Sequence, residues 1–138
     1  MTVTATPIFP QALNNTIGTI TAANTSTAEL MYTAGLNGSK IEAMLVTNND
    51  ANARTMTLSI KQVSTNYTLF CFTLPASAGT TAAATPYNVW NVANFGAVLP
   101  KDANGNPYLY LASGSSLYLS SGATVTNTMT VLTQGEDF

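Results

Sequence analysis

The side chains able to perform acid–base or nucleophilic chemistry are few in this chain. It contains no histidine, which excludes a Ser-His-Asp triad, a Cys-His pair and histidine metal ligands. General acid–base catalysis needs two carboxylates that face one site, and no such pair stands out from the sequence. The carboxylates are Glu29, Glu42, Asp50, Asp102, Glu136 and Asp137. We therefore expect no enzymatic activity, no catalytic residues and no cofactor.

One stretch carries oxygen ligands at the spacing of a calcium loop. Asp102, Asn104 and Asn106 stand at its first, third and fifth positions. The glycine comes two places early, at Gly105, and Ser113 occupies the twelfth position where glutamate is needed. Because Asn104-Gly105 is a strong hairpin signal, a plain turn is the favoured interpretation and no metal site is predicted.

The single cysteine, Cys71, lies in the apolar run from Leu69 to Phe72. A lone cysteine forms no disulfide within its own chain, and no histidine is present to activate the thiol. We therefore expect Cys71 to be buried and inert.

Aromatic side chains are the best candidates for contact with a partner. Tyr87 and Trp90 belong to an irregular segment, and Tyr108 and Tyr110 belong to a late strand. On an uncharged β surface such side chains stack on sugar rings or anchor protein interfaces. The favoured interpretation places Trp90 at one end of the core. Tyr108 and Tyr110 face outward if Leu109 and Leu111 face the core. The candidate interface residues are Pro7, Phe9, Pro10, Tyr87, Trp90, Tyr108 and Tyr110.

The composition indicates one all-β domain with little charge. Of the 138 residues, 47 are Thr, Asn or Ser, and only 7% are charged, against about 25% in an average domain. Threonine favours strands, and Asn and Ser favour turns. The net charge is -2 and the four basic residues lie far apart, so nucleic-acid binding is not expected. No apolar run reaches membrane-spanning length and the first residues do not resemble a signal peptide, so no membrane partner is expected.

Strand-like runs separated by turn signals recur along the chain, and the clearest alternation lies at 54–63. Residues 1–15 are predicted to form an extended N-terminal arm and residues 16–138 a single domain. About eight antiparallel strands in two packed sheets, a jelly-roll-like β-sandwich, is the economical arrangement, and an Ig-like Greek key is the alternative. The expected strands are 16–22, 28–33, 40–47, 54–63, 67–74, 108–112, 116–120 and 125–133.

Parts of the sequence resemble small virion proteins of tailed bacteriophages. The stretch from Tyr32 to Ile41, followed by Ala43 to Leu58, has their pattern of a strand, a Thr-Asn turn and an Arg-Thr-x-Thr-Leu strand. Tyr108 to Leu117 is similar to their L-x-L-x-x-G-x-x-L hairpin. The resemblance extends over about residues 30–135 and, with the size of the chain, is greatest to capsid cement or decoration proteins.

This resemblance implies a non-enzymatic virion protein that binds the outer surface of a phage capsid and reinforces it. The implied partner is the major capsid protein, and the implied state is a homo-oligomer, a dimer or trimer. Such a protein is made in the host cytoplasm and ends on the capsid exterior. Two alternatives stay open: a carbohydrate- or receptor-binding β-sandwich module, and a tail or connector component of a phage particle.

Overall fold

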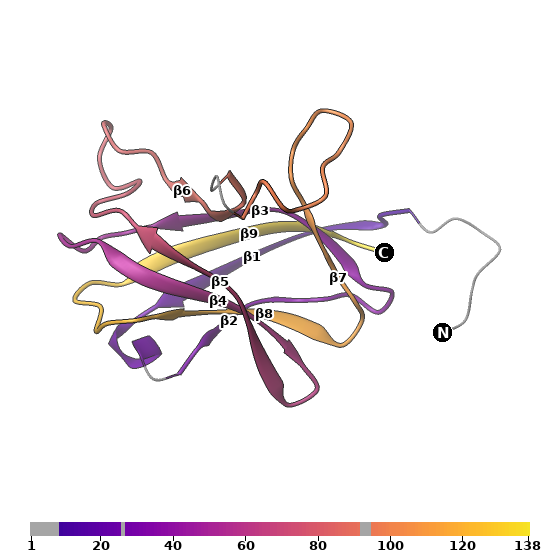
Figure 1. The fold of residues 1–138 in the computed structure, drawn as a ribbon, viewed down its shortest axis with the longest axis horizontal. Helices are drawn as coiled ribbons and strands as arrows, with labels where there is room; N and C mark the ends of the chain where they lie inside the picture. The colour runs from indigo at the N-terminus through magenta and orange to yellow at the C-terminus, as the bar shows by residue number, and fades with distance from the viewer. Residues whose placement is uncertain (1–8, 26, 92–94) are drawn as a thin grey trace.

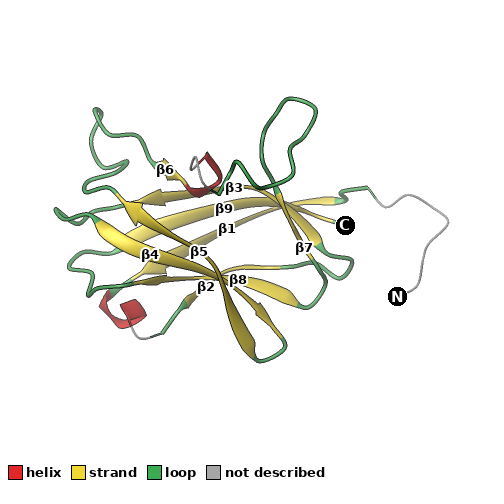
Figure 2. Cartoon of the chain, viewed as in Figure 1, coloured by secondary structure: helices red, strands yellow, loops and turns green. Residues whose placement is uncertain are grey.

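The computed structural model describes residues 9–25, 27–91 and 95–138, which fold into two antiparallel sheets packed face to face (Figure 1). The helical structure in these ranges is two short 3-10 helices, η1 (Ala22–Thr25) and η2 (Val89–Asn91) (Figure 2). The strands are β1 (Ala12–Ile20), β2 (Glu29–Thr33), β3 (Ser39–Thr47), β4 (Arg54–Gln62), β5 (Thr65–Leu74), β6 (Tyr87–Asn88), β7 (Leu109–Leu111), β8 (Ser115–Ser121) and β9 (Met129–Asp137).

The order of the strands is that of a jelly roll. One sheet, which we call sheet A, has the order β1-β9-β3-β6, and β7 also pairs with β3. The other, sheet B, has the order β2-β8-β4-β5. The chain crosses repeatedly from one sheet to the other, and its first and last strands become neighbours, as in double-sheet jelly rolls. The expected all-β, jelly-roll-like sandwich is therefore confirmed.

All eight expected strands are present, but several boundaries differ and one strand is additional. β1 begins at Ala12, so residues 12–15, which the sequence placed in the N-terminal arm, pair with β9. β9 extends to Asp137, four residues beyond the expected end, because its last residues pair with both β1 and β3. The two-residue strand β6 was not expected, since it lies in a segment without a clean period.

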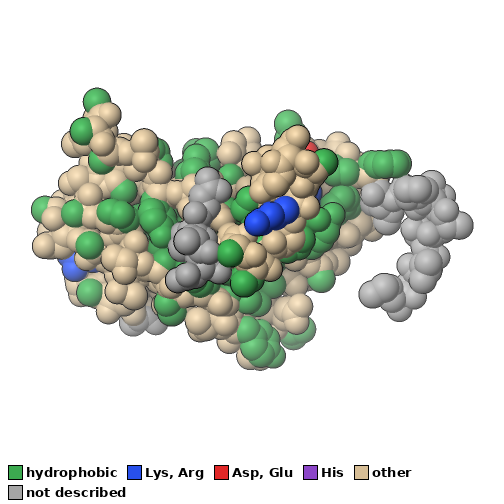
Figure 3. Space-filling view, turned by 45° about the horizontal axis from the view of Figure 1, so that its top comes forward, with side chains coloured by type: hydrophobic (Ala, Val, Ile, Leu, Met, Phe, Trp, Pro, Cys, Tyr) green, Lys and Arg blue, Asp and Glu red, His purple; other side chains and the backbone are tan. Residues whose placement is uncertain are grey.

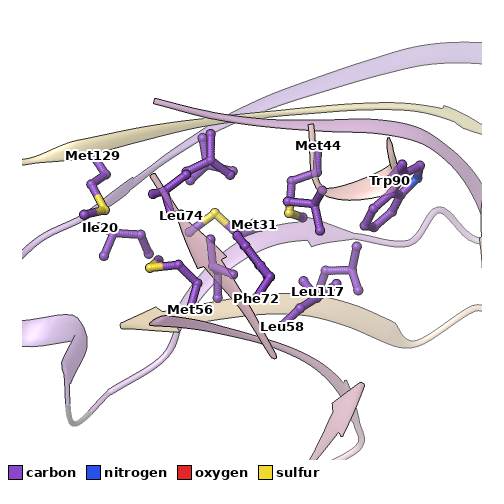
Figure 4. Close-up of a cluster of buried hydrophobic side chains, with 14 of the residues drawn as sticks. Ile20, Met31, Met44, Met56, Leu58, Phe72, Leu74, Trp90, Leu117 and Met129 are labelled. Atoms are coloured by element: carbon purple, nitrogen blue, oxygen red, sulfur yellow. The ribbon is translucent and has the colours of Figure 1, made fainter. Parts of the chain in front are cut away.

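The core lies between the sheets and is rich in flexible methionine side chains (Figure 4). Met44, Met56 and Met129 have no exposed surface, and Met31 is 2% exposed. Methionine fills irregular gaps because its unbranched side chain adapts to its neighbours. Trp90 is fully buried at one end of this cluster, where the sequence favoured placing it.

A buried ion pair closes one end of the sandwich. Asp50 Oδ2 accepts hydrogen bonds from Arg54 Nη2 at 2.6 Å and from the Thr126 backbone N–H at 3.0 Å. The Thr126 N–H and the Arg54 guanidinium hold the pKa of Asp50 below its usual 3.8. This pair therefore joins the turn after β3 to the turn before β9.

At the other end of the sandwich, Asp137 of β9 joins several strands. Its carboxylate accepts hydrogen bonds from Asn14 of β1, Tyr32 of β2 and Ser39 of β3. Burial raises the pKa of Asp137, but the bonds from Ser39, Tyr32 and Asn14 outweigh it and leave the pKa below its usual value. Burial, together with the bond to Asp137, raises the pKa of Tyr32 to about 12. The C-terminal residues thus anchor several strands.

The prediction that Cys71 is buried is wrong. Cys71 is exposed on β5, the edge strand of sheet B, whereas Phe72 and Leu74 of the same strand face the core. The run from Leu69 to Phe72 is apolar on both faces of the strand. Its hydrophobicity therefore did not show that only one face of β5 packs against the other sheet.

Candidate functional site

The candidate site begins at a gap along one edge of β3. β6 pairs with β3 at Leu45 and Val46, and β7 pairs with it from Ser39 to Ile41. Among the described residues, the β3 backbone between these two short strands has no strand partner on that side. Trp90 packs there, and its Nε1 donates a hydrogen bond of 2.9 Å to the carbonyl oxygen of Ile41. The indole therefore satisfies a buried acceptor where the ladder stops.

A β-bulge at the same point turns two adjacent side chains of β3 outward. The pairing of β3 with β9 shifts between Ile41 and Ala43, which leaves Glu42 as the extra residue. Ile41 and Met44 are buried, whereas Glu42 is exposed and Ala43 half-buried. The spacing of three between the buried residues is the sequence signal for this bulge. Its effect is to present Glu42 beside the outward-facing residues of sheet A.

Lys40 and Glu42 form an ion pair on this outer face. Lys40 Nζ lies 2.6 Å from Glu42 Oε1, and this hydrogen bond raises the pKa of Lys40. The same Nζ lies 5.1 Å from the centroid of the Tyr108 ring, within the range of a cation–π contact. Lys40 therefore connects β3 to the segment that leads into β7.

A closed turn from residues 101 to 107 stands next to this pair. Asp102 Oδ1 accepts hydrogen bonds of 2.8 Å from the backbone N–H groups of Asn104 and Asn106. The backbone N–H and side-chain amide of Asn106 and the backbone N–H of Asn104 lower the pKa of Asp102 despite some desolvation. Gly105 has a φ of 83°, which favours glycine. The Asp102 oxygens thus accept bonds from their own loop, as the turn interpretation predicts.

Tyr108 and Tyr110 meet at the edge of the site. Their rings are 5.0 Å apart between centroids at an interplanar angle of 70°, an edge-to-face contact. Tyr110 is 56% exposed, Tyr108 is half-buried, and Leu111 of the same strand faces the core. The prediction that these two tyrosines face outward with the leucines inward therefore holds.

These elements enclose a surface cleft of about 270 Å³. Its lining is mostly polar, and it comes from β3, β6 and the 101–108 segment: Lys40, Glu42, Asn88, Asp102, Asn106, Pro107 and Tyr108. Sequence reasoning found Tyr108 and the Asp102 turn but not Lys40, Glu42 or Asn88. Asn88 reaches the cleft through its pairing with Leu45, a contact between segments far apart in the sequence.

An apolar row crosses the same outer face of sheet A. Ile17 of β1 pairs with Leu132 of β9, which pairs with Leu45 of β3. Ile17 is 74% exposed, and Leu13, earlier on β1, is 81% exposed. Since Leu45 also pairs with Asn88, the row leads to the cleft. We call Leu13, Ile17, Leu45 and Leu132 the apolar row.

The other predicted interface residues lie elsewhere. Phe9 is 70% exposed and Pro10 is exposed, both just before β1, while Pro7 lies outside the described residues. Tyr87 is half-buried and its ring stacks on Phe72, with centroids 5.4 Å apart. Trp90 has no exposed surface. The predicted set is therefore split between the N-terminal segment, the core and the cleft.

The described part of the chain has few side chains suited to catalytic or metal chemistry. No group of three or more His, Cys, Asp or Glu side chains gathers there at metal-binding distances. No helix in residues 9–25, 27–91 or 95–138 is long and apolar enough to cross a membrane. Charged side chains are sparse on the face in Figure 3, where polar uncharged and hydrophobic atoms dominate. This surface is suited to binding through shape and neutral polar groups.

Comparison with protein-family models, with curated proteins and with solved structures found no match to this chain.

Proposed function

We propose that this protein is a non-enzymatic structural component of a phage virion that binds the outer surface of the capsid and reinforces it. Its partner is the major capsid protein, and it acts on the capsid exterior as a dimer or trimer after synthesis in the host cytoplasm. Neither nucleic acid nor membrane takes part. The observation that carries the proposal is the apolar row on the outer face of sheet A.

The apolar row has the features of a protein contact. Leu13 and Ile17 project from β1 on the solvent side of the sheet, where a half-buried antiparallel sheet normally carries polar residues. Ile17, Leu132 and Leu45 are in register across three strands, so they form one contiguous surface. Covering an exposed isoleucine stabilises a contact by about 1.5–3 kcal/mol.

The fold and the charge support the same proposal. Jelly rolls are frequent among viral capsid domains, which supports the proposal by analogy of fold. With 7% charged residues, many copies can pack on one particle with little mutual repulsion. A repeated lattice also multiplies weak contacts, so each copy needs only modest affinity.

Co-sedimentation with empty capsid shells of the encoding phage tests the proposal. We expect the wild-type protein to sediment with the shells. Ile17→Asp should bind at least about tenfold more weakly, because the contact loses the apolar side chain and must bury a carboxylate away from water. Val63→Asp is the matched control, because Val63 is 95% exposed at the β4–β5 hairpin of the opposite sheet. Wild-type protein that stays in the supernatant, or equal loss in both variants, refutes the proposal.

The mass in solution, measured by light scattering behind a sizing column, tests the oligomeric part of the proposal. A dimer or trimer agrees with a decoration protein seated on a symmetry axis of the capsid. A ring of six or more copies favours the tail or connector component instead, because such components close around the axis of the particle.

A further inference from the structure

The polar cleft beside β3 contains hydrogen-bonding groups that have no partner among the described residues. Glu42 uses Oε1 for Lys40, and Asn88 uses Oδ1 to accept the backbone N–H of Trp90. Asn106 uses Nδ2 to donate to Asp102. Within the described part of the chain, no hydrogen bond reaches Glu42 Oε2, Asn88 Nδ2 or Asn106 Oδ1. The cleft thus offers one donor group and two acceptors to a ligand.

The charges of the cleft are largely compensated from within. Lys40 is paired with Glu42, and the carboxylate of Asp102 accepts three hydrogen bonds from Asn104 and Asn106. Lys40 Nζ already holds the place between Glu42 and Tyr108 that a bound cation would occupy. An anion would meet the carboxylates of Glu42 and Asp102. A neutral, hydroxyl-rich ligand fits this arrangement best, because it both donates and accepts.

The aromatic edge supplies the apolar part of such a site. Tyr108 lines the cleft, and the 56% exposed ring of Tyr110 stands edge-to-face against it. A tyrosine ring presents a flat apolar face that packs against the C–H face of a sugar ring. The volume of about 270 Å³ is close to the lower limit of small-molecule sites, which corresponds to one sugar unit of a longer glycan.

We propose that this cleft binds a neutral saccharide. The sugar ring packs against Tyr108 and Tyr110, and its hydroxyl groups bond to Glu42, Asn88 and Asn106. The site is non-catalytic. It is a second binding activity that does not depend on capsid binding, since it uses none of the residues of the apolar row.

A printed array of neutral and acidic glycans, probed with the full chain, tests this inference. The site variants are Glu42→Gln, which keeps the shape of the side chain, and Tyr110→Ala, which removes an exposed ring. The control is Tyr67→Ala, because Tyr67 is 53% exposed on β5 of the opposite sheet. Melting temperatures establish that each variant is folded, and parallel arrays with EDTA establish that no metal is needed.

We expect wild-type protein and Tyr67→Ala to bind the same neutral glycans. Glu42→Gln should lose at least about tenfold in affinity, the effect of losing one hydrogen bond to a charged group. Tyr110→Ala should also lose at least about tenfold, because it removes the apolar surface that the sugar ring covers. Titration with maltose, lactose and chitobiose, followed by backbone amide NMR shifts, extends the test to weak binding. The inference is overturned by a blank array with no shift near Tyr108, by binding of anionic glycans alone, or by full binding in both site variants.

Discussion

Replacement of Trp90 by phenylalanine tests the link between the core and the candidate site. The substitution removes the indole N–H and leaves the buried carbonyl of Ile41 without its 2.9 Å hydrogen bond. An unsatisfied buried acceptor costs about 1–3 kcal/mol, and the smaller ring adds about 1 kcal/mol of lost packing. We expect the free energy of unfolding to fall by about 2–4 kcal/mol, a large part of the 5–15 kcal/mol typical of a domain.

Urea denaturation measures this loss. Circular dichroism follows the unfolding, because Trp90 is the single tryptophan of the chain and its fluorescence disappears with the substitution. Phe95→Leu is the matched control: Phe95 packs edge-on against Trp90 at 5.6 Å between centroids but makes no hydrogen bond through its ring. It should cost less than Trp90→Phe.

A local measurement separates the hydrogen bond from general packing. Since Ile41 precedes the bulge at Glu42, loss of its partner should speed amide hydrogen exchange in β3 around the bulge more than elsewhere in the sheet. A Trp90→Phe protein within about 0.5 kcal/mol of wild type, a difference normal for surface substitutions, would refute the role of the indole as a partner for β3.

Three further substitutions and conditions follow from the same structure. Thr133 Oγ1 is buried with no hydrogen-bond partner among the described residues. Thr133→Val keeps the shape of the side chain and should raise the free energy of unfolding, measured by urea titration, by about 1 kcal/mol. A lower free energy of unfolding would mean that the hydroxyl has a partner. Val63 has a φ of 57° at the β4–β5 turn, a costly conformation for a β-branched residue. Val63→Gly should therefore stabilise the protein by about 1 kcal/mol and raise its melting temperature. An unchanged melting temperature would contradict the strain at this position. Because the pKa of Asp50 is lowered in the folded protein, its contribution to stability is complete above the usual pKa of 3.8 and is lost as the pH falls toward the folded value. Below pH 3.8 the melting temperature of the wild type should therefore fall more steeply with pH than that of Asp50→Asn. Parallel curves for the two proteins would argue against the ion pair.

Much of the architecture was predictable because strand periodicity is a local property. The Arg54–Gln62 strand follows from alternating Met56 and Leu58, and the strand expected at 40–47 is present as β3, Ser39–Thr47. The turn around Gly105 follows from Asn-Gly chemistry. These signals need only neighbouring residues.

The position of each strand within the sheets was not predictable in this way. Cys71 and Ile17 are exposed because they lie on the outer faces of the two sheets, and which face is outer depends on how the sheets pack together. Asp137 belongs to an anchoring cluster because β9 continues between β1 and β3. The local sequence is the same whether a face of the strand packs against the other sheet or lies on solvent.

The sequence by itself determined an all-β domain with little charge. It favoured a buried Trp90 and predicted outward-facing Tyr108 and Tyr110 on the condition that the leucines beside them face inward. Only the tertiary structure decided that Glu42 is the extra residue of a bulge and that Asn88 lies next to it. The reason is physical: alternation fixes the face of each side chain along its own strand, but a cleft forms where distant strands pair, and that pairing is selected by the packing of the whole core.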